Sequence, residues 1–253
     1  MNRRAKIRNK ELDISDSDPV NLLWTGGWDS TFRLLQIVLE EKKKVQPYYV
    51  VRPQECAGKE IDTIHNIRRQ IFRDHPYTRK LFMGTILIDD MNIESDSEIT
   101  NEYKRIAKKK HINKQYEILA RFCKQLDIKN MELSVLSRET FSYFETNSTI
   151  FKYFEYPILG LTKLKMAEVA KQKGWEKYMK MTWFCRRPKG DRPCGLCGPC
   201  TDVMIDGLYW RLPLRSRLLA YIQLPFRKWW RKNYLKQENG INKHIKKLLK
   251  HRT

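Results

Sequence analysis

An apolar run that leads directly into a glycine-rich loop and then into an amphipathic helix is the feature that most constrains the fold of this chain. The run VNLLW (20–24) is followed by TGGWDST (25–31) and then by FRLLQIVLEE (32–41). In the last segment the apolar residues on one helical face are Phe32, Leu35, Val38 and Leu39. We therefore predict a strand, a loop and a helix in this order, which is the start of an α/β unit.

The predicted position of the loop suits the binding of a phosphate group. The first N–H groups of a helix have no partner within the helix, and the helix dipole adds positive potential at that end. Gly26 and Gly27 have no Cβ to keep a ligand away from the backbone. The loop lacks both the Lys-Ser/Thr pair of a Walker A loop and the spacing of a dinucleotide-binding loop. A turn that needs glycine for its geometry alone is the alternative interpretation.

Strand and helix patterns alternate along the rest of the chain as far as residue 174. We expect further strands at 45–51, 84–88 and 131–136, and a strand or extended segment at 151–157. We expect helices at 58–72, at 97–126 with one break, and from a cap at Thr162 to Gly174. This alternation predicts a Rossmann-like α/β fold, a parallel sheet with helices on both faces. The ligand site of such a sheet lies at the carboxyl ends of the strands, where the glycine-rich loop is expected.

Four cysteines near the C-terminal end form a second motif. Cys185, Cys194, Cys197 and Cys200 have eight, two and two residues between them. Two residues between cysteines allow both thiolates to face one ion, and four thiolates without histidine are typical of a closed, structural zinc site. An iron–sulfur cluster is the main alternative. Cys56 and Cys123 lack this spacing and are interpreted as core or surface thiols.

The charge of the chain is concentrated toward its C-terminus. The net charge is +21, and residues 211–253 hold thirteen Lys or Arg and one acidic residue. In this tail RKWWRK (227–232) places cations beside tryptophans, and 241–250 has an apolar helical face formed by Ile241, Ile245, Leu248 and Leu249. Such a segment suits nucleic acid phosphates or an anionic membrane surface. A helical extension that packs on the core is the alternative.

These features divide the chain into three parts: a basic, flexible arm (1–17), a main domain (18–208) and a basic, aromatic, helical tail (209–253). The arm has no apolar run behind its charges, so we do not expect a secretory signal. No stretch has the length of a membrane span. Clustered cysteines with metal-ligand spacing suit a reducing compartment, and we predict a cytoplasmic protein.

With both motifs considered, residues 18–208 resemble the 7-cyano-7-deazaguanine synthases of queuosine precursor biosynthesis, which belong to the PP-loop ATP pyrophosphatase superfamily. The loop TGGWDST is similar to the SGGxDS loop of that superfamily, with Thr25 in place of the first serine. Asp206, Gly207 and Leu208 resemble the Asn-Gly-Leu that follows the last cysteine in the family. Pro157, Lys163, Gly174 and Cys185 also have the family's spacing.

The resemblance implies a fold of the adenine nucleotide alpha-hydrolase type and an ATP-dependent ligase that adenylates a carboxylate for amide and nitrile formation. It implies ATP, Mg²⁺ and Zn²⁺ as cofactors, ammonia as co-substrate, and a homodimer. The catalytic residues would be Asp29, Ser30 and Lys163, with Asp29 positioning magnesium and Lys163 neutralising a phosphate. The residues around the pyrophosphate would be Thr25, Gly26, Gly27, Asp29, Ser30 and Thr31.

Two segments depart from the family. HINKQYEILARF (111–122) replaces its Pro-Gly-Arg-Asn segment, and SRETFSYFETNST (137–149) replaces its substrate loop. No family substrate residue is therefore transferred to this chain, and the identity of the carboxylate stays open. Two other functions also stay open: a zinc-stabilised module that has lost the chemistry and binds nucleic acid or an anionic surface through its tail, and an RNA-modifying thiolase or amidotransferase.

Overall fold

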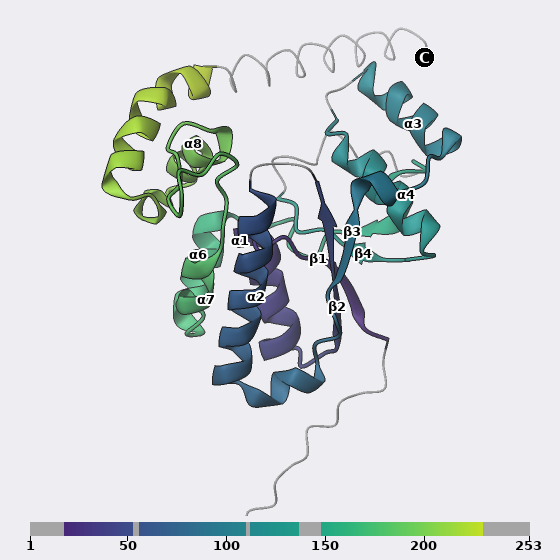
Figure 1. The fold of residues 1–253 in the computed structure, drawn as a ribbon, viewed down its shortest axis with the longest axis horizontal. Helices are drawn as coiled ribbons and strands as arrows, with labels where there is room; N and C mark the ends of the chain where they lie inside the picture. Colours follow the sequence, from purple (N-terminus) through teal and green to yellow (C-terminus); the bar gives the residue numbers. More distant parts are fainter. Residues whose placement is uncertain (1–17, 53–55, 110–111, 137–147, 230–253) are drawn as a thin grey trace, which may run out of the picture.

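The computed structural model describes residues 18–52, 56–109, 112–136 and 148–229 (Figure 1). The predicted arm at 1–17 lies outside these residues. So do the tail beyond residue 229 and most of the 137–149 segment. In the described part of the chain, no helix is both long enough and apolar enough to cross a membrane.

A five-stranded parallel sheet forms the centre of the molecule, in the order β3-β2-β1-β4-β5. The strands are β1 (Val20–Leu23), β2 (Val45–Val51), β3 (Ile86–Asp89), β4 (Met131–Glu132) and β5 (Phe154–Glu155). β1 pairs in parallel with β2 on one side and with β4 on the other. The strand order therefore reverses at β1, which creates the crevice where ligands bind in open α/β sheets.

Alternating residues of β1 pack on opposite faces of the sheet. Leu22 and Trp24 belong to the larger apolar core, and Leu23 belongs to the smaller one. On the larger core lie α1 (Trp28–Leu35), α2 (Ala57–Asp74), α6 (Lys163–Gln172) and α7 (Glu176–Met181). On the smaller core lie α3 (Ser97–Ala107) and α4 (Gln115–Gln125), on the other side of the sheet in Figure 1. The predicted α/β fold with helices on both faces is confirmed.

The helices follow the apolar periodicity of the sequence. Ile64, Ile67 and Ile71 of α2 are buried, as their helical spacing predicts. The side-chain oxygen of Thr162 accepts a hydrogen bond from the N–H of Lys165 at 3.1 Å, which caps α6 at its predicted start. Gly174 follows α6 with φ of +70°, a conformation that glycine adopts without strain.

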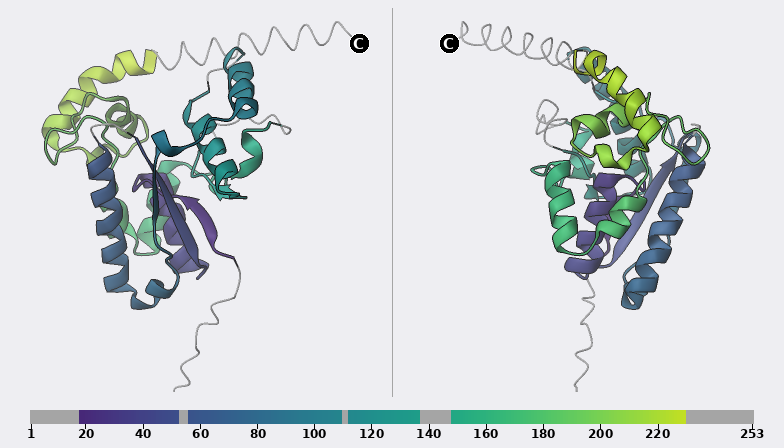
Figure 2. Two further views of the ribbon diagram at one scale, coloured as in Figure 1. Left: turned by 45° about the vertical axis from the view of Figure 1, so that its right-hand side comes forward. Right: turned by 90° about the vertical axis from the view of Figure 1, so that its left-hand side faces the viewer.

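Shorter elements connect these strands and helices. A π-helical turn, η1 (Gln36–Glu40), follows α1 directly. Single 3₁₀ turns are η2 (Pro76–Lys80), η3 (Asp90–Asn92), η4 (Phe151–Tyr153) and η5 (Tyr209–Arg211). α8 (Gly198–Ile205) carries the last cysteine, and residues 214–229 form a final helix at the outer edge of the molecule (Figures 1 and 2).

A buried ion pair joins α1 to β4, the strand that lies beside β1 where the strand order reverses. Arg33 donates two hydrogen bonds to the carboxylate of Glu132, at 2.7 and 2.9 Å, and it also pairs with Glu41. Both Arg33 and Glu132 are almost completely buried. Burial alone would lower the pKa of Arg33, but the carboxylates of Glu132 and Glu41 raise it, so the guanidinium stays charged.

Candidate active site and candidate metal centre

The glycine-rich loop connects the carboxyl end of β1 to the first turn of α1, as predicted. Gly26 has φ of +69°, and Gly27 caps α1 without a side chain. A Cβ on Gly26 would lie 3.1 Å from Thr63 and 3.3 Å from the carbonyl of Glu60, both in α2. Glycine is therefore required here by the backbone conformation and by the close approach of α2.

Three polar side chains of the loop are engaged within the loop or the core, and Asp29 is partly exposed. Ser30 lies 3.3 Å from the Thr25 hydroxyl and accepts a weak bond from the Thr25 N–H at 3.4 Å, so these residues hold the loop closed. The hydroxyl of Thr31 accepts a hydrogen bond from the indole of Trp24 at 3.1 Å inside the core, and its N–H donates to Gly27. Asp29 is partly exposed in the first turn of α1. Asp29, the carboxylate of the loop, faces a neighbouring element, α6.

The neighbour of Asp29 is Lys163, the first residue of α6. The Lys163 ammonium lies 3.8 Å from a carboxylate oxygen of Asp29 and 3.2 Å from one of Asp206. Asp206 follows α8, and its side chain is almost completely buried. Two predicted catalytic residues, Asp29 and Lys163, 134 positions apart in the chain, are therefore brought together with a second acidic residue, Asp206.

A second cation, Arg211 of η5, lies at the same site. Its guanidinium stacks on the rings of Trp28 and Phe184, at 4.7 and 4.6 Å from their centroids. It donates hydrogen bonds to the carbonyl and the hydroxyl of Thr182, at 2.8 and 2.6 Å. Burial lowers the pKa of Arg211 to about 10, against the opposing charge of Asp29, so the group is still cationic at neutral pH.

Sequence reasoning did not assign Asp206 or Arg211 to the site. Asp206 had a local signal, because it stands in the Asp-Gly-Leu segment after the last cysteine. Arg211 had none, since it is one of thirteen cations counted in the basic tail. Its role depends on contacts with Trp28 and Thr182 that no local pattern predicts.

A cavity of about 580 Å³ lies beside the loop, between α2, the 180–184 segment and η5. Its lining includes the cations Lys59, Lys180 and Arg211, the carboxylate of Asp191, which pairs with Lys59 at 2.5 Å, and the aromatic rings of Trp183, Phe184 and Trp210. Trp183 joins it to the loop, because its N–H donates to the carbonyl of Gly26 at 3.0 Å. The volume is in the range of small-molecule sites, and the lining favours a ligand with anionic and ring components.

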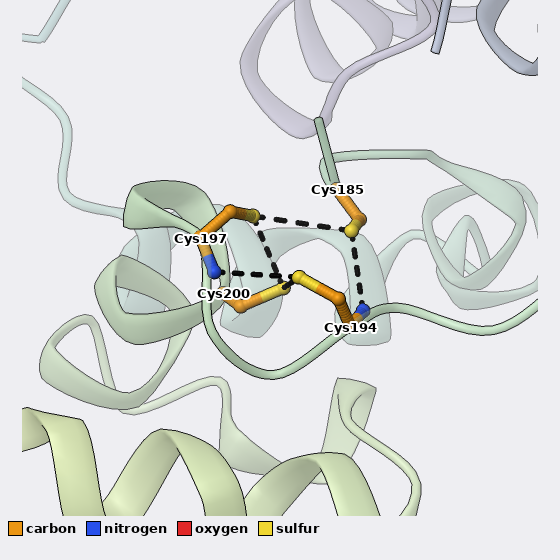
Figure 3. Close-up of side chains that lie close together, drawn as sticks. All are labelled: Cys185, Cys194, Cys197 and Cys200. Carbon is orange, nitrogen blue, oxygen red and sulfur yellow. Dashed lines mark hydrogen bonds between the residues drawn. The ribbon is translucent and has the colours of Figure 1, made fainter. Parts of the chain in front are cut away.

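The four predicted metal ligands converge in space. Cys185, Cys194, Cys197 and Cys200 point their sulfurs toward one another (Figure 3), all within 4.8 Å. Sulfur–sulfur distances are 3.4 Å for 197–200 and 3.9 Å for both 185–197 and 194–200. Four sulfurs at the zinc–thiolate distance from one tetrahedral ion would lie about 3.8 Å apart. The cluster could therefore hold a metal ion such as zinc.

Backbone N–H groups surround the sulfurs in the way that ligating thiolates require. The N–H of Cys194 donates to the sulfur of Cys185 at 3.2 Å. Those of Leu196 and Cys197 donate to the sulfur of Cys194 at 3.3 Å. Such bonds stabilise negative charge on sulfur and orient the ligands. The other two cysteines, Cys56 and Cys123, were interpreted as core or surface thiols, and the structure buries both outside the cluster.

We expect that Gly195→Ala destabilises the cysteine loop strongly. Gly195 has φ of +77°, and an added Cβ would lie 2.3 Å from the carbonyl oxygen of Ser216, so backbone must move. The left-handed conformation and the clash together should cost about 3 kcal/mol.

Gly190→Ala is a matched control, because Gly190 has φ of +58° with nothing within 4 Å of the added carbon. Urea unfolding should show a much smaller loss for Gly190→Ala, about 1 kcal/mol. Equal losses for the two variants would contradict this reading of the contact.

The two sites are connected through residues 182–185. Thr182 accepts from Arg211, Trp183 donates to Gly26, and the indole of Trp183 donates to the carbonyl of Cys185 at 2.8 Å. The loop and the first metal ligand are thus held by one short segment.

Comparison with known proteins adds no assignment, because the sequence matches no protein-family model and no curated protein.

Proposed function

We propose that this protein is an ATP-dependent ligase that adenylates a carboxylate, with a function like that of the 7-cyano-7-deazaguanine synthases and a PP-loop fold of the adenine nucleotide alpha-hydrolase type. The observation that carries the proposal is the contact of Lys163 with Asp29 and Asp206 at the start of α1. A carboxylate and an ammonium at the N-terminus of a helix, where the helix dipole adds positive potential, suit a magnesium–polyphosphate complex.

Each residue of the site has a role in this chemistry. Gly26 and Gly27 allow the phosphates to approach the backbone of the loop, which Thr25 and Ser30 hold closed. Asp29 provides the hard oxygen ligand that Mg²⁺ prefers. Lys163 and Arg211 provide positive charge for the phosphate oxygens and for the departing AMP. Asp206 holds Lys163 in place from the side of α8.

The reaction proceeds by two activations. A carboxylate oxygen attacks the α-phosphorus of ATP and pyrophosphate leaves, which gives an acyl-adenylate. Ammonia then attacks the carbonyl carbon, loses a proton and expels AMP, which gives the amide. The amide oxygen then attacks the α-phosphorus of a second ATP and pyrophosphate leaves, and loss of AMP and of both protons on nitrogen gives the nitrile. The pair of cations serves both activations, because both place negative charge on leaving phosphate oxygens.

The cavity beside the loop is the place for the acid in this proposal. Its three aromatic rings suit a planar ring, and Lys180 and Arg211 suit a carboxylate, while Lys59 is paired with Asp191. We propose zinc as the ion of the four-cysteine cluster, in a structural role, since four thiolates leave no open position for a substrate. Colour and metal analysis of the purified protein distinguish zinc from an iron–sulfur cluster.

A thiolase mechanism is less well supported, because it needs a nucleophilic thiolate outside the metal cluster. Burial raises the pKa of Cys123 to about 12. Burial and the nearby carboxylate of Glu60 raise the pKa of Cys56 to about 12. Neither thiol would be ionised at neutral pH.

Incubation with ATP, Mg²⁺, ammonia and 7-carboxy-7-deazaguanine tests the proposal. The expected products are AMP and pyrophosphate in equal amounts, at two of each per nitrile formed. A panel of other aromatic and heteroaromatic carboxylates should be assayed in parallel, because the substrate segments differ from those of the family. No carboxylate-dependent release of pyrophosphate across the panel would overturn the ligase and favour a binding module.

A further inference from the structure

The helix at 214–229 exposes an apolar stripe to solvent. Six large apolar side chains on it are between 59% and 72% exposed: Leu214, Leu218, Tyr221, Ile222, Phe226 and Trp229. Their spacing places them on one side of the helix. The helix lies at the outer edge of the molecule, beside α8 and away from the sheet (Figures 1 and 2). In a protein surrounded only by water, this side would be polar.

The opposite side of the helix is attached to the cysteine loop and α8. The Ser216 hydroxyl donates to the carbonyl of Pro193 at 2.5 Å, and Ala220 is completely buried. Arg227 pairs with Asp202 of α8 at 3.4 Å. These contacts on the inner side of the helix fix its orientation, so that the apolar stripe faces solvent.

The charges near the stripe favour an anionic lipid surface over nucleic acid. Arg217 and Arg227 are turned toward the body, where they contact Tyr209 and Asp202. Arg215 and Lys228 are exposed beside the apolar stripe. Nucleic acid would need cations across the outward side, whereas that side is apolar with cations at its margins. The sequence at 230–253 adds eight Lys or Arg and only one acidic residue.

A second copy of the chain is a less suitable partner. Each copy carries a net charge of +21, so pairing two such surfaces brings like charges together. Anionic lipid headgroups instead complement the cations while the acyl region accepts the apolar residues. Tyr221 and Trp229 have the amphipathic rings that are enriched at this depth of a membrane.

We propose that the 214–229 helix lies in the interface of an anionic membrane, with Leu218, Ile222 and Phe226 inserted and the cations at the headgroups. This is peripheral attachment of a folded protein and is independent of the ligase proposal.

Vesicle flotation of the full-length protein tests it. We expect binding to vesicles of phosphatidylcholine mixed with phosphatidylserine and much weaker binding to phosphatidylcholine alone. Ile222→Ser with Phe226→Ser should weaken binding to the mixed vesicles by about tenfold or more, because apolar area is lost without a change in charge. Met91→Ser with Leu126→Ser is the matched control, since both side chains are exposed and belong to other parts of the fold, η3 and the end of α4. Thermal unfolding and metal content should be the same for both variants.

Three results would overturn the proposal. The first is vesicle binding that both double variants retain equally, or that high salt abolishes completely, which would indicate charge alone. The second is tight binding to a DNA or RNA duplex with none to mixed vesicles. The third is a dimer in light scattering that Ile222→Ser with Phe226→Ser converts to a monomer. Pyrophosphate release by this variant without lipid is expected to be unchanged, so loss of membrane binding and loss of ligase activity are separable.

Discussion

Replacing Cys200 with serine is expected to prevent metal binding by the four-cysteine cluster and to lower the stability of the protein severely. Cys200 is completely buried, and its sulfur lies 3.4 Å from that of Cys197 and 3.9 Å from that of Cys194. A hydroxyl is a poor ligand for a thiolate-binding ion, and structural zinc contributes about 10–16 kcal/mol to the folding of small domains. Loss of about 4 kcal/mol would lower the melting temperature by roughly 8–16 °C. Calorimetry and elemental analysis measure both effects.

Cys56→Ser provides the control for this substitution. Cys56 is also buried, but it lies outside the cluster, and its thiol donates to Glu60 at 3.3 Å, a bond that a serine hydroxyl can replace. This variant should keep a full equivalent of metal and lose about 1 kcal/mol of stability. A Cys200→Ser protein with wild-type metal content and melting temperature would refute the metal centre.

Asp29→Asn is expected to abolish ATP-dependent pyrophosphate release while leaving the fold intact. The amide keeps the shape of the side chain but removes the charge that attracts Mg²⁺ and pairs with Lys163. We expect a fall in kcat/KM on the order of 100-fold or more, as for other groups that stabilise transition-state charge. The side chain is partly exposed, so the melting temperature should change little.

Asp62→Asn is a suitable comparison for Asp29→Asn. It removes the same charge from an exposed position on α2 and should leave turnover unchanged. Equal turnover by Asp29→Asn and the wild type would reject the catalytic assignment. A loss in Asp62→Asn as large as that in Asp29→Asn would show that net charge, rather than the position of Asp29, determines the rate.

Local patterns predicted the helices and the two motifs well. Apolar spacing located α2, and a threonine cap and a glycine located the ends of α6. The ends of β4 and β5 were predicted less accurately. The segment 131–136 forms a strand only at Met131–Glu132, although the N–H of Leu133 still donates to Glu155. The segment 151–157 begins as a 3₁₀ turn, and only Phe154–Glu155 is a strand. Each of these strands ends where its pairing with the neighbouring strand ends. The composition of the segment itself does not specify that position.

The residues of the site show which contacts local sequence patterns can predict and which they cannot. A glycine-rich loop and closely spaced cysteines are recognisable because their chemistry needs residues that are near one another in the chain. Asp206 and Arg211 reach Lys163 and Asp29 only through the packing of α8 and η5. Sequence spacing contains no information about that packing, so half of the charged site became visible only in three dimensions.

The hydrogen bond between Trp183 and Gly26 also has a consequence for synthesis of the protein. The loop follows β1, and its partners Trp183 and Arg211 are made about 160 to 190 residues later. At the usual elongation rates of 5–20 residues per second, the nascent chain spends roughly 10–40 s before Arg211 is added. During this time the glycine-rich loop at the carboxyl end of β1 lacks its covering segment, and a chain terminated before residue 183 would lack both of these contacts.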